Sequence, residues 1–302
     1  MGAGVAEIWD DVRIFLAVAR SESLSAAGRL LRMDPATVGR RIARLEQSLN
    51  APLFAKSPQG YAMTEPGARL LRHAEAAEQA MQAAAEAVAG VTEGLSGQIR
   101  IGAPDGCANF LLPQVCAAIA DDNPELEVQI VALPRVVNLS KREADMAIAV
   151  SPPTAGRLSV QKVTDYHLHL AASESYLAQH PPIRTRGDLN GHRLVGYISD
   201  MIFDKELDYL SDLGVTRHAL ASNSVAVQFH WLRQGAGIGI VHDFALPAAP
   251  DMVKVLGDDI SLTRSFYLVR HADDRRLERM NRFAALLADG LRRETARLEG
   301  LT

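Results

Sequence analysis

The sequence is poor in cysteine and has no long apolar segment. Its 302 residues include only two cysteines, Cys107 and Cys116, which excludes a disulfide framework. No apolar run approaches the roughly 18–20 residues of a membrane-spanning helix. The first ten residues have neither the basic region nor the apolar core of a signal peptide. We therefore expect a cytoplasmic protein with no membrane partner.

Catalytic motifs are also missing. There is no P-loop, no nucleophile elbow and no zinc-protease helix. The glycines of Gly235–Gly239 superficially resemble a dinucleotide loop, but a helical pattern precedes them and a strand follows, which reverses the required order. His167 and His169 would share one face of a strand and could hold a metal, although an ordinary pair of histidines is favoured. We expect no enzyme, no cofactor and no metal.

The chain lacks the positive net charge of many nucleic-acid-binding proteins, since its net charge is -4. That charge is unevenly distributed. Residues 1–72 contain ten Lys and Arg against seven Asp and Glu, a net charge of +3; the remainder contains 22 against 29, a net charge of -7. A basic N-terminal part on an acidic remainder indicates a nucleic-acid-binding module joined to another part. The length favours two or three domains.

Two short helical patterns flank the break at Arg32-Met33-Asp34. The second pattern opens with Asp34 as an N-cap and Pro35 as the first helical residue. Its apolar residues follow helical spacing, and its opposite face is basic, with Thr37, Arg40, Arg41, Arg44 and Ser48. A helix, a tight turn and a second helix with a basic outer face fit the major groove of DNA. An ordinary helical hairpin with solvated arginines is the less favoured alternative.

At these residues the chain resembles the LysR-type transcriptional regulators. The resemblance is carried, in the order found in the family, by Ser23–Leu30, Ala36–Glu46, Leu53–Lys56 and Thr64–Gly67. Two positions depart from the family pattern: Gly39 replaces a common serine, and Pro35 replaces a common glutamine. These departures shift the expected base readout to Thr37, Arg41 and their neighbours.

The resemblance implies a winged helix-turn-helix domain over residues 1–64, which binds double-stranded DNA. A first helix at 10–19 would brace the helix pair, and residues 51–64 would form a two-stranded wing in which Lys56 and Gln59 could reach DNA. The DNA-binding residues expected on this basis are Ser23, Ser25, Thr37, Arg40, Arg41, Arg44 and Lys56.

Residues 65–91 are rich in alanine and have a heptad-like apolar seam. We predict a linker and dimerisation helix over 65–93, because such a long helix has little neighbouring sequence to cover it, and the family uses this segment in that way. The alternative is an amphipathic helix that packs on its own domain. The predicted dimerisation residues are Leu70, Ala74, Ala77, Met81, Ala84 and Val88.

Beyond a hinge at 94–97, strand and helix patterns alternate, which predicts parallel strands with crossover helices. The resemblance implies an effector-binding domain over 94–302 with two α/β lobes of the periplasmic-binding-protein type. Lobe I would comprise about 94–163 and 266–302, and lobe II about 164–265. The overall class is α+β. We predict strands at 98–103, 127–132, 145–150, 167–172, 193–197, 217–221, 238–241, 252–256 and 265–270, with helices at 107–120, 136–142, 223–234 and from 273.

A ligand cleft is expected where strands end and helices begin. By resemblance, two loops and one strand end face the effector: Pro104, Asp105, Gly106 and Cys107; Ser222, Asn223, Ser224 and Val225; and Tyr197 with Ile198. Cys107 could be a redox switch at a helix N-terminus, but plain lining of the pocket is favoured. Asp105 either caps its own helix, the interpretation we favour, or faces the cleft, where it would repel a carboxylate. If Asp105 caps its helix, an anionic group of the effector would lie at Asn223, Ser224 and Val225. If it faces the cleft, a neutral, hydroxyl-bearing or cationic effector is expected.

These observations predict a sequence-specific transcriptional regulator that responds to a small-molecule effector and acts as a homodimer or homotetramer, with RNA polymerase as a further candidate partner. Two alternatives remain at this point. One is an effector-independent or architectural DNA-binding protein whose C-terminal half only oligomerises. The other is an enzyme built on the α/β half, against which the missing catalytic motifs count.

Overall fold

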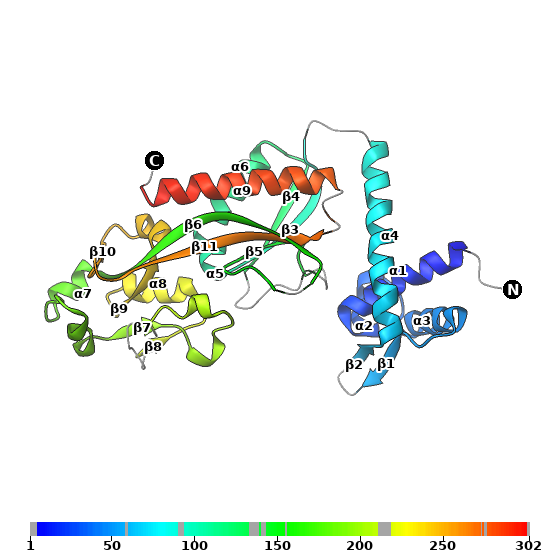
Figure 1. Ribbon diagram of the computed structural model, residues 1–302, viewed down its shortest axis with the longest axis horizontal. Coiled ribbons are helices and arrows are strands. Elements are labelled where there is room, and N and C mark those ends of the chain that lie inside the picture. Colours follow the sequence, from blue (N-terminus) through cyan, green and yellow to red (C-terminus); the bar gives the residue numbers. More distant parts are fainter. Residues whose placement is uncertain are drawn as a thin grey trace. The chain divides into compact units, whose positions relative to one another are not determined.

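The computed structural model describes residues 5–57, 60–89, 94–132, 139, 143–154, 156–210, 219–272, 274 and 277–300. The chain forms two compact units, which meet in sequence between Thr92 and Glu93. In the part that the structure describes, no helix has the length and apolar character needed to cross a membrane. Figure 1 shows the elements of each unit.

The N-terminal unit is helical, with one small antiparallel hairpin (Figure 1). Its core is formed mainly by α1, with Ile14, Phe15 and Val18 fully buried, together with Val38 and Leu45 of α3. The elements are α1 (Val5–Ser21), α2 (Leu24–Leu31), α3 (Pro35–Leu49), β1 (Phe54–Ser57), β2 (Gly60–Met63) and α4 (Glu65–Ala89).

Local sequence signals define the ends of α2 and α3. The Ser23 hydroxyl accepts a hydrogen bond from Ala26 N at 3.3 Å, and Asp34 Oδ1 accepts one from Ala36 N at 2.8 Å. Both helices end at a residue in the left-handed region, Arg32 with φ 54° and Asn50 with φ 48°. A left-handed residue after the last turn reverses the chain sharply. The predicted helix–turn–helix is therefore present, with Asp34 as the N-cap of its second helix.

The start of the hairpin is fixed to α3 and α4 by three motif residues. Glu46 Oε1 of α3 accepts hydrogen bonds from Leu53 N at 2.7 Å and Phe54 N at 3.1 Å. Thr64 accepts from Gly67 N at 3.1 Å through its hydroxyl, which also donates to Pro52 O at 2.6 Å. Gly67 itself lies against the backbone, because a Cβ there would be 2.2 Å from Leu53 O.

The C-terminal unit is built on a nine-stranded mixed sheet with the order β4-β3-β5-β11-β6-β9-β7-β8, in which β10 pairs with β6. The strands are β3 (Gly97–Ala103), β4 (Leu126–Ala132), β5 (Met146–Ala149), β6 (Leu158–Ser173), β7 (Leu194–Gly196), β8 (Leu220–Ala221), β9 (Ile238–His242), β10 (Met252–Lys254) and β11 (Ser261–His271).

Two long antiparallel strands, β6 and β11, join the two ends of this sheet (Figure 1). The β3 half, which we define as β4, β3 and β5, is parallel and attaches through Tyr267–Arg270 of β11. The β9 half, defined as β9, β7 and β8, is also parallel and attaches through Leu168–Ala171 of β6. The β6–β11 register shifts between Phe266 and Tyr267. The exact lobe boundaries stay a prediction.

Five α-helices and several 3-10 turns accompany the sheet: α5 (Asp105–Phe110), α6 (Leu112–Asp121), α7 (Glu174–Ala178), α8 (Val225–Arg233) and α9 (Glu278–Leu298) in the described part of the unit. The helix predicted at 107–120 is in fact two helices, because the chain breaks at Leu111 and α6 begins at Leu112, with Pro113 in its first turn. The strand predicted at 167–172 belongs to a much longer β6. The predicted helix at 136–142 lies outside the described residues except for Leu139.

Candidate DNA-binding and effector sites

The outer face of α3 carries the predicted DNA-contacting side chains. Arg40 is exposed, and its Nη2 donates to Thr37 Oγ1 at 2.9 Å, so these two side chains lie together one helical turn apart. Neither Arg40 nor Thr37 belongs to the buried core. They are in a position to contact DNA if α3 enters a groove.

Arg41 and Arg44 share a buried carboxylate of α1. Asp11 is 3% exposed, and both of its oxygens accept hydrogen bonds: Oδ2 from Arg44 Nε at 2.7 Å, and Oδ1 from Arg44 Nη2 at 2.8 Å and from Arg41 Nε. Burial acts to raise the pKa of Asp11, but the hydrogen bonds and charges of Arg44 and Arg41 outweigh it and lower that pKa. Asp11 therefore stays ionised and orients both guanidinium groups.

The structure gives different environments to the other three predicted DNA-contacting residues, Ser23, Ser25 and Lys56. Ser23 is the N-cap of α2, so its hydroxyl has a structural role in addition to any contact with DNA. Ser25, in the first turn of the same helix, is exposed. Lys56 lies in β1, but its side chain is outside the described residues, as is Gln59.

The predicted dimerisation seam divides into two parts along α4. Ala74 belongs to the core of the N-terminal unit, and Leu70 packs against that core. The prediction that Ala74 is available to a second copy is wrong, because its own domain buries it, whereas the half-buried Leu70 stays a prediction. Met81 is 60% exposed and Ala84 is exposed, Ala77 is half-buried, and the Val88 side chain is outside the described residues.

An ion pair holds the middle of α4 to α1. Arg20 Nη2 donates to Glu78 Oε2 at 2.7 Å, and Arg20 Nη1 donates to Glu78 Oε1 at 3.2 Å. This paired contact continues the intradomain packing of Leu70 and Ala74 by one more turn of the helix. Among the seam residues whose side chains the structure describes, the exposed ones, Met81 and Ala84, lie beyond Glu78.

In the C-terminal unit, the structure brings two of the predicted effector loops together. Asp105 Oδ2 accepts hydrogen bonds from Ser224 Oγ at 3.0 Å and from Ala226 N at 2.9 Å, at the N-terminus of α8. The favoured interpretation, that Asp105 only caps its own helix, is wrong: the N-cap of α5 is Pro104, and the carboxylate reaches across to α8. The third predicted element, Tyr197 with Ile198, follows β7.

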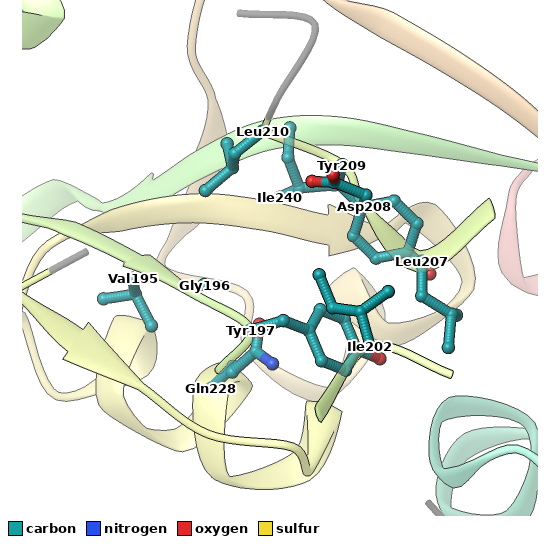
Figure 2. A pocket seen from close by; sticks show the side chains of 10 residues that line it. All are labelled: Val195, Gly196, Tyr197, Ile202, Leu207, Asp208, Tyr209, Leu210, Gln228 and Ile240. Atoms are coloured by element: carbon teal, nitrogen blue, oxygen red, sulfur yellow. The ribbon is translucent and has the colours of Figure 1, made fainter. Parts of the chain in front are cut away.

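Beside Tyr197 lie Tyr209, His242 and Gln228, three side chains that the sequence pattern did not indicate as part of the site. Tyr197 and Tyr209 lie edge to face with ring centroids 5.8 Å apart, and Tyr209 also meets the His242 ring at 6.0 Å. Figure 2 shows Tyr197, Tyr209 and Gln228 among the side chains that line a small void in this part of the C-terminal unit. That void is about 10 Å³, enough for roughly one water molecule.

His242, at the end of β9, lies beneath the first effector loop. It is 4% exposed, its ring stacks on Tyr166 at 5.5 Å, and a Cβ on Gly106 would be 3.1 Å from its Cε1. Its Nδ1 has no hydrogen-bond partner among the described residues. Sequence reasoning missed His242 because nothing in its local pattern distinguishes it from a core position of the strand.

Burial lowers the pKa of His242 to about 3, and the neighbouring Asp243 opposes this only weakly. The folded chain therefore keeps this ring neutral while the unfolded chain is protonated below about pH 6.5. We expect the stability of the C-terminal unit to be complete above that pH and to fall as the pH decreases from about 6.5 toward 3. His242→Phe should flatten the dependence of the melting temperature on pH in this range.

The exposed His230 on α8 provides the control for that measurement. His230→Ala should leave the pH dependence of the melting temperature as it is in the wild type. An equally steep acid slope in His242→Phe and the wild type would show that His242 does not cause it.

The two cysteines are both buried and unbridged. Burial, with a smaller contribution from Cys116, raises the pKa of the Cys107 thiol well above its usual range, and burial raises the pKa of Cys116 to about 12. A thiol that resists ionisation is a poor nucleophile. The structure thus favours Cys107 as lining over Cys107 as a redox switch.

The two histidines that share a strand face bind different carboxylates. His167 Nδ1 lies 2.7 Å from Glu299 Oε2, whereas His169 Nδ1 lies 2.8 Å from Asp243 Oδ1, and Lys254 Nζ also donates to Asp243 at 2.7 Å. Each ring thus has its own acidic partner. Within the described ranges, no group of three or more His, Cys, Asp and Glu side chains is placed to hold a metal ion.

A winged helix-turn-helix unit with an exposed basic helix, followed by an α/β unit whose two sheet halves are joined by polar contacts between Asp105 and the start of α8, defines a ligand-responsive DNA-binding regulator. Residues 9–68 match the family model described as bacterial regulatory helix-turn-helix protein, lysR family, and residues 92–292 match the LysR substrate binding domain. The second match alone covers more than half of the chain. The chain therefore belongs to the LysR family of transcriptional regulators, with a DNA-binding and an effector-binding domain.

Similar proteins have the same organisation. The transcriptional regulator CrgA of Neisseria meningitidis serogroup C is 25% identical over 271 residues, which is 87% of this chain and 90% of CrgA. The regulator DmlR of Escherichia coli is 27% identical over 76% of each chain. Among solved structures, CrgA has a TM-score of 0.57 at 22% identity, covering 93% of this chain and 98% of CrgA. ArgP from Mycobacterium tuberculosis has a TM-score of 0.66 at 19% identity, covering 95% and 96%.

Proposed function

We propose that this regulator reads DNA with the outer face of α3. The observation that carries the proposal is the shared contact of Arg41 and Arg44 with Asp11, which fixes two partly exposed guanidinium groups on one face of the helix. A guanidinium has five N–H donors, so a carboxylate that takes one or two leaves others for a base edge or a phosphate. Arg41 is assigned to base readout, and Arg40 to phosphate, with Thr37 beside it.

The remaining residues of the proposed DNA interface lie on α2 and on the hairpin. Ser25 is exposed at the start of α2, and Ser23 precedes it. Lys56 in β1 is assigned to the DNA backbone by its place in the wing. Phosphate contacts of this kind set the register of the helix on the duplex but carry no sequence information.

The effector is proposed to bind between the β3 half and the β9 half of the sheet. The residues assigned to this site are Pro104, Asp105, Gly106, Cys107, Tyr197, Ile198, Ser222, Asn223, Ser224 and Val225. We add Tyr209 and His242 to the proposal, because their rings contact one another and Tyr209 contacts Tyr197. Supporting this assignment, Asp105 and Ser224 are in direct contact although 119 residues separate them. Ser222 also lies at this point, where its Oγ accepts from Ser224 N at 3.1 Å.

The effector assignment is tested by ligand screening of the full-length protein. A library of small metabolites is screened by thermal shift, and each stabilising compound is added to a footprinting reaction on a duplex selected by the protein. Stabilisation with an altered footprint and no chemical turnover is the expected result. Stabilisation with turnover would identify an enzyme instead. Failure of every compound to stabilise the protein would favour regulation without an effector.

We further propose that the distal part of α4 joins two copies of the chain into a dimer, and that a homotetramer forms if the C-terminal units also pair. Met81 is a large apolar residue at a 60% exposed position, and Ala84 follows on the same face. Small residues such as Ala84 allow two helices to approach closely. We also propose RNA polymerase as a further partner of this regulator. The proposed location is the cytoplasm, and the proposed role is regulation without enzymatic activity.

Met81→Glu should lower the molar mass measured by light scattering and weaken binding to a two-half-site duplex, because a charge at the helix pairing face separates the two DNA-binding units. Ala76→Glu provides the control, since Ala76 is exposed on a different face of the same helix. The control should retain both the mass and the affinity of the wild type. An unchanged mass in Met81→Glu would remove α4 from the interface.

A further inference from the structure

The carboxylate of Asp105 occupies the place at which α8 would receive an anionic group. Ser224 is the N-cap of α8, and its Oγ accepts from Val227 N at 3.3 Å while its hydroxyl donates to Asp105 Oδ2. The Ala226 N–H donates to the same oxygen at 2.9 Å. A helix N-terminus with free N–H groups and a capping hydroxyl attracts anions. Here the anion is a side chain from the other half of the sheet.

Asp105 is also held in place from its own side. Asn109 Nδ2 donates to Asp105 Oδ1 at 3.1 Å and to the Asp105 carbonyl at 2.8 Å. Both carboxylate oxygens are therefore hydrogen-bonded, Oδ1 by α5 and Oδ2 by α8. An ionised carboxylate gains most from such an arrangement because it is purely an acceptor.

Three further contacts join the β3 half of the sheet and its loops to the β9 half. Phe110 of α5 meets Phe229 of α8 edge to face, with centroids 5.0 Å apart. Ser151, after β5, donates to the carboxylate of Asp204 on the opposite side. The buried His242 ring, whose Nδ1 lacks a partner among the described residues, lies directly under Gly106.

We propose that Asp105 is a built-in substitute for an effector carboxylate: it fills the anion-binding position at the N-terminus of α8 and holds the two halves of the sheet closed. The inference rests on the proposed effector cleft and deepens it. An effector of this protein then binds without a carboxylate at Ser224, because a second negative charge there would be repelled by Asp105. The prediction that an anionic group of the effector lies at Asn223, Ser224 and Val225 is replaced by this assignment.

Acetate tests the proposal, because Asp105→Gly removes the CH₂COO⁻ group that acetate nearly reproduces. In the full-length protein, Asp105→Gly should lower the melting temperature of the C-terminal unit by several degrees. It should also raise the rate of amide hydrogen exchange at the start of α8 by tenfold or more, since Ala226 N loses its acceptor. Acetate at 10–100 mM, roughly the range for a weak single-anion site, should reverse both effects in a saturable way.

Controls separate a specific site from a general salt effect. Chloride at equal ionic strength should not restore Asp105→Gly, and acetate should not affect the wild type, in which the position is already filled. Asp105→Asn keeps the side-chain volume and should not respond to acetate. If Asp105→Gly fails to fold, Asp105→Asn still measures the effect of removing the negative charge on the melting temperature and on amide exchange. Ser224→Ala added to Asp105→Gly should weaken the response to acetate.

Two results would overturn the proposal. One is an unchanged melting temperature and unchanged amide exchange at α8 in both Asp105→Gly and Asp105→Asn. This result would show that the contact between Asp105 and the start of α8 does not stabilise the C-terminal unit. The other is an equal response to acetate in the wild type and in Asp105→Gly, which would show an adventitious effect of the anion. Neither readout involves DNA, so failure here is distinct from failure of the proposed regulatory function.

Discussion

Replacing Arg41 with alanine should weaken binding to the operator by about 1–3 kcal/mol, the range measured for a bidentate arginine–guanine contact. The loss on a random duplex should be much smaller, because a base contact contributes only where the right base is present. The structural reason for choosing Arg41 is that Asp11 orients its guanidinium before DNA arrives. Fluorescence anisotropy on both duplexes, at several salt concentrations, measures the two losses.

Two variants provide the comparison for Arg41→Ala. Arg40→Ala should weaken binding to both duplexes alike and reduce the dependence of the affinity on salt by about one counterion, as expected for a phosphate contact. Asp11→Asn should reduce the preference for the operator without weakening binding to the random duplex, since it releases both arginines and removes one negative charge. Equal losses on both duplexes for Arg41→Ala would contradict its assignment to base readout.

Replacing Gly67 with alanine should destabilise the N-terminal unit by about 3 kcal/mol, at the upper end of the usual cost of overpacking. The added methyl group would lie 2.2 Å from Leu53 O and 2.9 Å from Met63 Cγ, so the backbone of the hairpin would have to move. Denaturant unfolding can be followed through Trp9, which packs partly buried against the core of this unit. In a Trp231→Phe background, Trp9 is the one tryptophan left in the chain.

Gly39→Ala is the matched control for Gly67→Ala. A Cβ at Gly39 meets only the end of the Leu24 side chain, at 3.2 Å, and that group can move. Alanine is also the better helix former by about 1 kcal/mol. We therefore expect Gly39→Ala to keep or raise the stability of the unit. A denaturation midpoint for Gly67→Ala equal to that of the wild type would contradict the close approach of α4 to the hairpin.

The helix–turn–helix was predictable because its determinants are local. Asp34 and Pro35 define the start of α3 within the sequence itself, and the apolar spacing of Val38, Ile42 and Leu45 matches the face that is buried. The alternation of strands and helices in the second unit is local in the same sense. Such signals act over a few residues, so they can be recognised without knowing what packs against them.

Features that depend on long-range contacts were not predictable. An apolar seam on α4 has the same periodicity whether its partner is a second copy or its own domain. In the structure Ala74 belongs to the domain core and Leu70 packs against it. Asp105 at the start of α5 has the sequence pattern of a helix cap, yet its partner is Ala226, 121 residues away. The pairing of Asp11 with Arg41 and Arg44 likewise spans two helices.

The lengths of the central strands were also underestimated. The first half of β6 has no alternation of buried and exposed positions, because two half-buried residues are followed by three exposed ones. Only the more buried end of the strand, at 167–172, was therefore recognisable. Pairing with β11 along nearly the whole strand supplies the order that the local pattern lacks. This is a tertiary effect on strand formation, which intrinsic preferences do not capture.

Selection of DNA by the full-length protein tests most directly whether α3 recognises a specific DNA sequence. A pool of random duplexes is passed over the wild type and over Arg41→Ala, and the bound molecules are sequenced after several rounds. We expect the wild type to enrich one motif composed of two related half-sites. The half-sites should be separated by a whole number of helical turns, as dimeric helix–turn–helix proteins require. We also expect Arg41→Ala to lose the preference at defined base pairs of each half-site. A bound pool with the same sequence composition as the input, for a protein that binds the duplexes, would contradict sequence-specific recognition by α3.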